Sequence, residues 1–124
     1  MSRKKILNQQ KELLRIQKNR KKLLEPFFSE DELIEGSYVE IYQKCGRVGC
    51  HCEKKPTHLV TRLSRWADGK LKHKVVRIAD RQQIKKWSDN YRKHKNAMAQ
   101  LNKYNFQEKK IMNFIIELKK KSYE

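Results

Sequence analysis

Three cysteines and two histidines fall within the fourteen residues CGRVGCHCEKKPTH, which run from Cys45 to His58. Zinc prefers a tetrahedral set of thiolate and imidazole ligands, and four such ligands make a structural site. The spacing C-x4-C-x-C-x5-H lets a turn at Gly46 bring the three sulfurs together. The predicted ligands of a structural zinc ion are therefore Cys45, Cys50, Cys52 and His58.

The choice of the fourth ligand depends on the backbone around it. On extended backbone, His51 would project to the side opposite Cys50 and Cys52. His58 starts the next expected strand and suits the site better, with His51 as the alternative and His73 as a more distant one. A fully ligated Cys3His site leaves no position for water, so we expect the zinc to stabilise the fold and not to catalyse.

Other uses of these cysteines fit the sequence less well. An odd number of cysteines argues against disulfides in an intracellular chain, and the C-x-x-C spacing of redox sites is absent. Three unconnected buried thiols are the remaining alternative. Because neither paired carboxylates at a plausible pocket nor a glycine-rich phosphate loop accompanies the cluster, we expect the protein not to be an enzyme.

The balance of charge indicates a polyanionic partner. The 124 residues include 31 Lys and Arg against 14 Asp and Glu, which gives a net charge of +17. Only the stretch 26–43 is acidic on balance. A charge this large opposes compaction unless a polyanion screens it, which predicts binding to DNA or RNA. The alternative is a set of solvated, lysine-rich helix faces.

The sequence also bears on where the protein works. No apolar run is long enough for a membrane span, and the basic start MSRKK is followed by no block typical of a signal peptide. Neither basic helix pairs its lysines with a broad apolar face, so an anionic membrane surface is a poor partner. We therefore expect a cytoplasmic protein.

The expected nucleic-acid contacts lie in the zinc loop and in the hairpin that follows it. These residues are Arg47, Lys54, Lys55, Arg62, Arg65, Trp66, Lys70, Lys72 and Lys74. Lys and Arg on phosphates give affinity without reading sequence. Trp66 either stacks on an unpaired base or packs on its cross-strand neighbour. The alternative function is an accessory subunit that docks by its helices onto a larger nucleoprotein complex of a mobile element, a phage or a defence system.

Two helical segments and one hinge are expected around this unit. Residues 1–28 form a basic helix with a heptad-like apolar stripe. The stripe consists of Ile6, Leu13, Ile16, Leu23 and Phe27, with Gln9 and Arg20 in the same seam. Residues 29–36 form an acidic hinge, in which Ser29 caps a short helix from Glu30 to Glu35 that ends at Gly36.

Residues 37–79 form the zinc-stabilised β-unit. From Ser37 the apolar period changes to two, which predicts a strand with Val39 and Ile41 on the face of Cys45. The Asp-Gly pair at residues 68–69 predicts a type I′ hairpin between residues 58–66 and 71–78. The expected cross-strand pairs are Trp66 with Leu71, Arg65 with Lys72, Leu63 with Lys74, Thr61 with Val76, and Leu59 with Ile78.

Residues 80–124 form the long basic C-terminal helix, which Asp80 and Gln83 begin with a capping-box pattern. Its seam consists of Ile84, Trp87, Tyr91, His94, Met98, Leu101, Tyr104, Ile111, Ile115 and Leu118. The expected partner of this seam is the N-terminal helix, packed antiparallel as in a coiled coil, with a homodimer left open. The fold class is α+β: two long helices and a small zinc-stapled antiparallel β-unit with a hairpin.

Residues 34–105 resemble a widespread prokaryotic and phage domain family of unknown function. The resemblance is carried by the motif EGS-x-x-E-x-Y-x-x-CG-x3-C-x-C, by the hairpin and by the helix opening DRQQIKKWSDNYRKHK. It implies that Cys45, Cys50, Cys52 and His58 correspond to the metal positions of the family. After His58 this chain reads LVT where the family has GPY, so the aromatic roles of that segment do not carry over. The resemblance supports the zinc and the hairpin and names no function.

Overall fold

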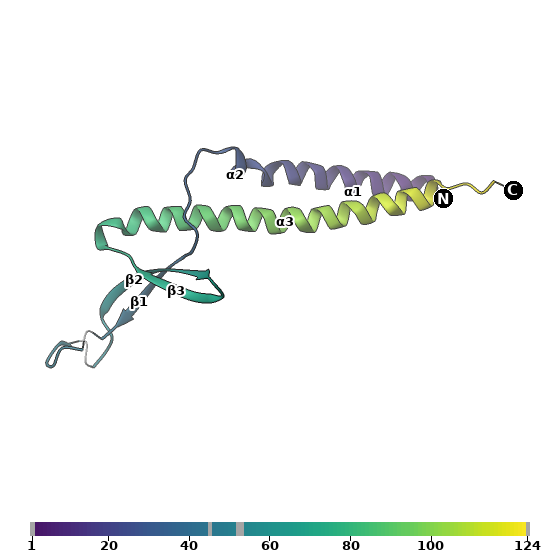
Figure 1. Cartoon of the computed structure of the whole chain (residues 1–124). Coiled ribbons are helices and arrows are strands. Elements are labelled where there is room, and N and C mark those ends of the chain that lie inside the picture. The colour runs from purple at the N-terminus through teal and green to yellow at the C-terminus, as the bar shows by residue number, and fades with distance from the viewer. Residues whose placement is uncertain (1, 45, 52–53, 124) are drawn as a thin grey trace. The chain divides into compact units, whose positions relative to one another are not determined.

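The computed structural model describes residues 2–44, 46–51 and 54–123 (Figure 1). Its elements are α1 (Ser2–Leu23), α2 (Glu25–Phe28), β1 (Ser37–Gln43), β2 (His58–Ala67), β3 (Lys70–Val75), the 3-10 helix η2 (Ile78–Asp80) and α3 (Arg81–Lys119). The predicted α+β class with two long helices and an antiparallel sheet is thus confirmed. The chain divides into two compact units, Met1–Ser29 with His94–Glu124 and Glu30–Lys93.

The first unit is an antiparallel pair of helices. Arg20 of α1 pairs with Glu108 of α3 at 3.0 Å, and Phe27, after α1, lies edge-on to His94 at a ring distance of 5.2 Å. The later residue on the N-terminal side, Phe27, thus contacts the earlier residue of α3, His94. The N-terminal helix and α3 therefore run antiparallel. Ile16 is fully buried in this seam. The intramolecular pairing expected from the heptad-like stripe is therefore observed.

The seam of α3 follows the predicted spacing with one exception. Met98 is 48% exposed, whereas its neighbour Ala97 is buried. A small side chain at the contact lets helices approach closely, so alanine occupies the seam where the apolar pattern alone favours the larger methionine. The other predicted seam positions of α3 are all partly buried.

The short helix predicted from Glu30 to Glu35 was wrong. The helix instead precedes Ser29: α2 starts with Pro26 in its first turn, and the Ser29 hydroxyl donates to the Pro26 carbonyl at 2.8 Å. Proline suits the first turn of a helix, because the amide it lacks has no partner there. Residues 30–36 are non-helical. Their backbone forms hydrogen bonds with α3.

The second unit contains a three-stranded antiparallel sheet in the order β1-β2-β3. Asp68 and Gly69 have φ angles of 53° and 73°, as a type I′ turn requires. The resulting register pairs Trp66 with Leu71 and Ala67 with Lys70. The predicted partners of Arg65 and Leu63 are confirmed as well.

The far end of the hairpin departs from the prediction. Thr61 and Val76 meet as expected, since the Val76 amide donates to the Thr61 carbonyl at 2.8 Å. The expected pairing of Leu59 with Ile78 was wrong, because Ile78 begins η2 and is exposed. The Arg81 guanidinium donates instead to the Leu59 carbonyl at 3.2 Å. A side chain of α3 thus satisfies a carbonyl that the strand leaves open.

Within this unit, hydrogen bonds to α3 fix the start of the sheet. The Ser88 hydroxyl donates to the Gly36 carbonyl at 2.8 Å and accepts from the Tyr38 amide at 3.0 Å. The Asn90 side chain donates to the Glu32 carbonyl at 2.9 Å. These bonds hold the extended segment 30–36 along the helix and set where β1 begins.

Candidate metal centre and nucleic-acid interface

Two of the four predicted zinc ligands lie side by side. Sγ of Cys50 is 3.3 Å from Nε2 of His58, the first residue of β2. At a tetrahedral zinc with ordinary bond lengths, sulfur and nitrogen ligands are about 3.6 Å apart. The donor atoms of Cys50 and His58 therefore have a separation that suits one shared metal ion.

His51 also lies close to this pair. Its Nδ1 is 3.9 Å from Sγ of Cys50, and its ring centroid is 5.6 Å from that of His58. Residue 51 is in a 3-10 turn and not on extended backbone, so the alternation expected there does not apply. The prediction that His51 projects away from Cys50 was therefore wrong, and both histidines lie close to the Cys50 thiol.

A turn directly precedes Cys50, the residue whose thiol lies next to His58 of β2. Gly46 and Gly49 have φ angles of 81° and 80°, which glycine adopts without strain. The Cys50 amide donates to the Arg47 carbonyl at 3.4 Å, which closes a turn around Gly49. The turn that the structure shows thus lies at residues 47–50, and at Gly46 it shows a positive φ angle without an assigned turn.

The remaining predicted ligands, Cys45 and Cys52, lie outside the residues that the structure describes. Among the described residues, no three His, Cys, Asp or Glu side chains gather as a metal-binding group. His73, the distant alternative, lies in β3 and shares a hydrogen bond of 2.6 Å with Ser64 instead. Thiol and imidazole are the ligand types that zinc prefers, so Cys50 and His58 fit the predicted metal by their chemistry and by their separation.

The register of the hairpin gathers four basic residues on one face. Side chains alternate along a strand, and Arg65 stands directly opposite Lys72. Lys70 and Lys74 are two residues away on β3 and share this face. All four are exposed, and β3 is the edge strand of the sheet. We call Arg65, Lys70, Lys72 and Lys74 the basic ladder.

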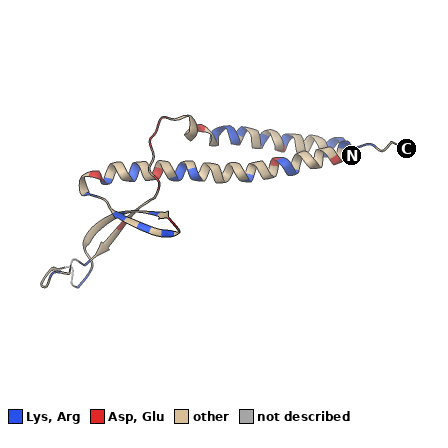
Figure 2. Ribbon diagram, viewed as in Figure 1, with Lys and Arg blue, Asp and Glu red and all other residues tan. Residues whose placement is uncertain are grey.

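One acidic residue accompanies the basic ladder. The hairpin sequence 58–77 contains six Lys and Arg residues and a single acidic one, Asp68. Asp68 accepts from Lys72 at 3.2 Å, and both side chains are largely exposed. Figure 2 shows basic residues along β3 as well as on both long helices. A surface pair of this kind is weak, so the ladder keeps most of its positive potential.

The other predicted contacts are not all on this face. Arg62 and Trp66 stand on the opposite face of β2, which we call the Trp66 face. Arg47, Lys54 and Lys55 are exposed in the loop before β2. The nine predicted nucleic-acid contacts thus divide into the basic ladder, two residues of the Trp66 face and three of the loop.

Sequence reasoning missed one contact on the Trp66 face. Ser64 stands opposite His73 in the register, and their side chains share the hydrogen bond described above. The Asp-Gly turn fixes this pairing just as it fixes that of Trp66 with Leu71. The pairing of Ser64 with His73 could therefore have been predicted from the sequence.

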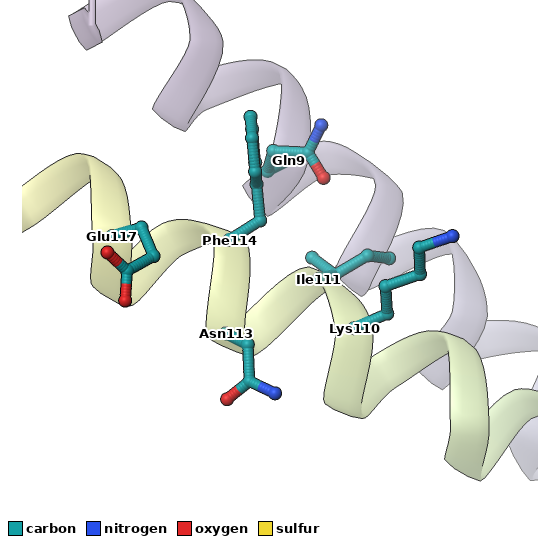
Figure 3. A pocket seen from close by; sticks show the side chains of 6 residues that line it. All are labelled: Gln9, Lys110, Ile111, Asn113, Phe114 and Glu117. Atoms are coloured by element: carbon teal, nitrogen blue, oxygen red, sulfur yellow. The ribbon is translucent and has the colours of Figure 1, made fainter.

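A hollow of about 430 Å³ opens in the helical pair of the first unit. Figure 3 shows Phe114 of α3 beside Gln9 of α1, with Ile111 next to them and Glu117 pointing away. Gln9 stands at a seam position where an apolar side chain would fill the space. We therefore attribute the hollow to helix packing and not to a catalytic site.

Comparisons with protein-family models, curated proteins and solved structures found no match to this chain. None of the helices that the structure describes is both long and apolar enough to cross a membrane.

Proposed function

We propose that the protein is a non-catalytic nucleic-acid-binding protein that contacts mainly the phosphate backbone of DNA or RNA. The observation that carries this proposal is the basic ladder. Like charges directly opposite each other on a sheet destabilise it, and Arg65 faces Lys72 with Lys70 and Lys74 on either side. Such an arrangement has a use when a polyanion supplies the missing negative charge.

The loop before β2 adds to this surface. Arg47, Lys54 and Lys55 are exposed there. Extended backbone rises about 3.4 Å per residue, so alternate lysines of β3 are about 7 Å apart along the strand. A row of cations with this spacing suits a chain of phosphates better than a single small anion.

A structural zinc ion belongs to the same proposal. Support comes from the 3.3 Å approach of Cys50 to His58 and from the thiol and imidazole chemistry of the segment. Cys45 and Cys52 are the further ligands that the spacing predicts. Such an ion would stabilise the loop that precedes β2, and with it the exposed basic residues of that loop.

A competing explanation concerns the edge of the sheet. Lysines on an edge strand also discourage pairing with another chain, which explains some of the charge on β3 without any ligand. It does not explain Arg65, because β2 is the central strand and has both edges paired. The phosphate-binding interpretation accounts for all four residues of the basic ladder.

A second candidate function is an accessory subunit that docks on a larger nucleoprotein complex. It is favoured by apolar residues that stay exposed on the helical pair of the first unit. They include Leu7, Leu14, Phe106, Met112, Phe114 and Ile116. In that case the isolated protein would bind nucleic acid poorly, and its helices would carry the affinity for a protein partner.

A salt titration of the wild-type protein separates these two candidates. Binding to labelled DNA and RNA oligonucleotides is measured by fluorescence anisotropy from low to physiological salt. Four phosphate contacts predict a slope of log K against log salt of about −3.6 on duplex DNA and about −2.8 on a single strand. No measurable affinity at low salt would refute the proposal and favour the accessory subunit.

A further inference from the structure

The indole of Trp66 is more exposed than cross-strand packing would leave it. The residue is 69% exposed although it stands directly opposite Leu71, which is itself 48% exposed. A tryptophan that serves the fold usually buries most of its large apolar ring. Packing on Leu71 therefore does not account for this side chain, and the ring is available to a partner.

The neighbours of Trp66 favour a partner that is flat and negatively charged. Ser64 and His73 hold each other at 2.6 Å on the same face, and Arg62 is partly buried beside them in the register. The acidic residue of the hairpin, Asp68, already pairs with Lys72. An apolar protein surface would have to desolvate these polar and charged groups, whereas a nucleotide offers a stacking ring and a phosphate together.

We propose that Trp66 stacks on an unpaired base of a single-stranded nucleic acid while the basic ladder holds the adjoining phosphates. This inference rests on the proposed function and names its substrate class. In a duplex each base is already stacked between its neighbours, so a base must first be unstacked at a cost. A single strand presents its bases without that cost, and the unpaired base is common to DNA and RNA.

The position of β3 explains how one strand of nucleic acid reaches both faces. β3 is the edge of the sheet, and Lys70, Lys72 and Lys74 stand along it. Their long, flexible side chains can follow phosphates that cross this edge. Trp66 is paired with Leu71 on the same edge strand, so a base can turn onto the Trp66 face from there.

The test compares single strands with duplexes of the same sequence, in DNA and RNA arms, for the full-length protein and three variants. Trp66→Thr removes the ring and keeps a residue that favours strands, whereas Trp66→Phe keeps an aromatic ring. Tyr42→Thr is the matched control, because Tyr42 is an aromatic residue of β1 that is 61% exposed and stands on the other face. Circular dichroism checks that each variant is folded.

Loss of one base stack predicts that Trp66→Thr weakens single-strand binding by about 5- to 150-fold. Duplex affinity should change by less than about twofold, and Trp66→Phe should retain most of the single-strand affinity. Equal losses on single strands and duplexes, no loss at all, or an equal loss in Tyr42→Thr would overturn the stacking role while the basic ladder stands. A wild-type protein that binds no nucleic acid would overturn the proposed function itself.

Discussion

Removal of the Ser88 hydroxyl should loosen the β-unit from α3. Ser88 is 5% exposed. Its hydroxyl donates a hydrogen bond to the Gly36 carbonyl and accepts one from the Tyr38 amide. In Ser88→Ala both backbone groups lose their partner, and each lost bond to a partly buried group costs about 1 to 2 kcal/mol. Alanine recovers about 0.5 kcal/mol through its higher helix propensity. The expected net loss in the free energy of unfolding is about 1.5 to 3.5 kcal/mol.

Urea denaturation followed by circular dichroism measures this loss, with Asn96→Ala as the matched control. Asn96 is exposed on the same helix, so its replacement should leave stability unchanged or raise it by about 0.5 kcal/mol. The slope of the transition should be the same in all three proteins, because the surface exposed on unfolding does not change. If Ser88→Ala were as stable as Asn96→Ala, the two bonds would not anchor the start of β1.

Two further predictions concern the loop and the hinge. Metal analysis of the purified protein should find about one zinc ion per chain, with Cys50→Ser and His58→Ala losing it; zinc retained in Cys50→Ser would exclude the proposed site. Gly36→Ala should lower stability by about 1 to 3 kcal/mol, because φ is +134° and an added Cβ would lie 3.0 Å from the Ser64 carbonyl oxygen. Gly69→Ala should cost less, because φ is +73° there and an added Cβ would meet no atom within 4 Å; an equal loss in the two variants would contradict the expected clash at Gly36.

Features set by local chemistry could be predicted from the sequence. The Asp-Gly pair fixed the turn and, through it, the register from Trp66 to Thr61. The apolar stripes gave the antiparallel helical pair, because period and direction leave few ways to bury them. The basic ladder follows from this register, since alternate residues of a strand share a face.

Features set by tertiary contacts could not be predicted in this way. Ser29 followed by acidic residues resembles a helix start, yet the backbone of residues 30–36 bonds to Ser88, Asn90 and Trp87 of α3 instead. Ile78 fits the strand pattern, but the Arg81 guanidinium donates to the Leu59 carbonyl, with which Ile78 was expected to pair. The predicted direction of the His51 side chain assumed an extended backbone, whereas residue 51 lies in a 3-10 turn. In each case a partner distant in sequence or a local turn overrode a short-range pattern.

The Tyr38 hydroxyl donates a hydrogen bond to Glu40, which lies two residues further along β1. Burial raises the pKa of Tyr38, and Glu40, which accepts its hydrogen bond at 3.1 Å, raises it further. The phenol is therefore neutral throughout the physiological range.

The most direct test of the central claim compares two variants that lose the same charge from different places. Lys70, Lys72 and Lys74 are replaced by glutamine in one variant, and the exposed α1 residues Lys4, Lys5 and Lys11 in the other. If the basic ladder holds phosphates, the first variant lowers the magnitude of the salt slope by about 2 to 3, and the second leaves it nearly unchanged. Equal slopes in the two variants would mean that net charge alone drives binding and would contradict a phosphate site on the hairpin.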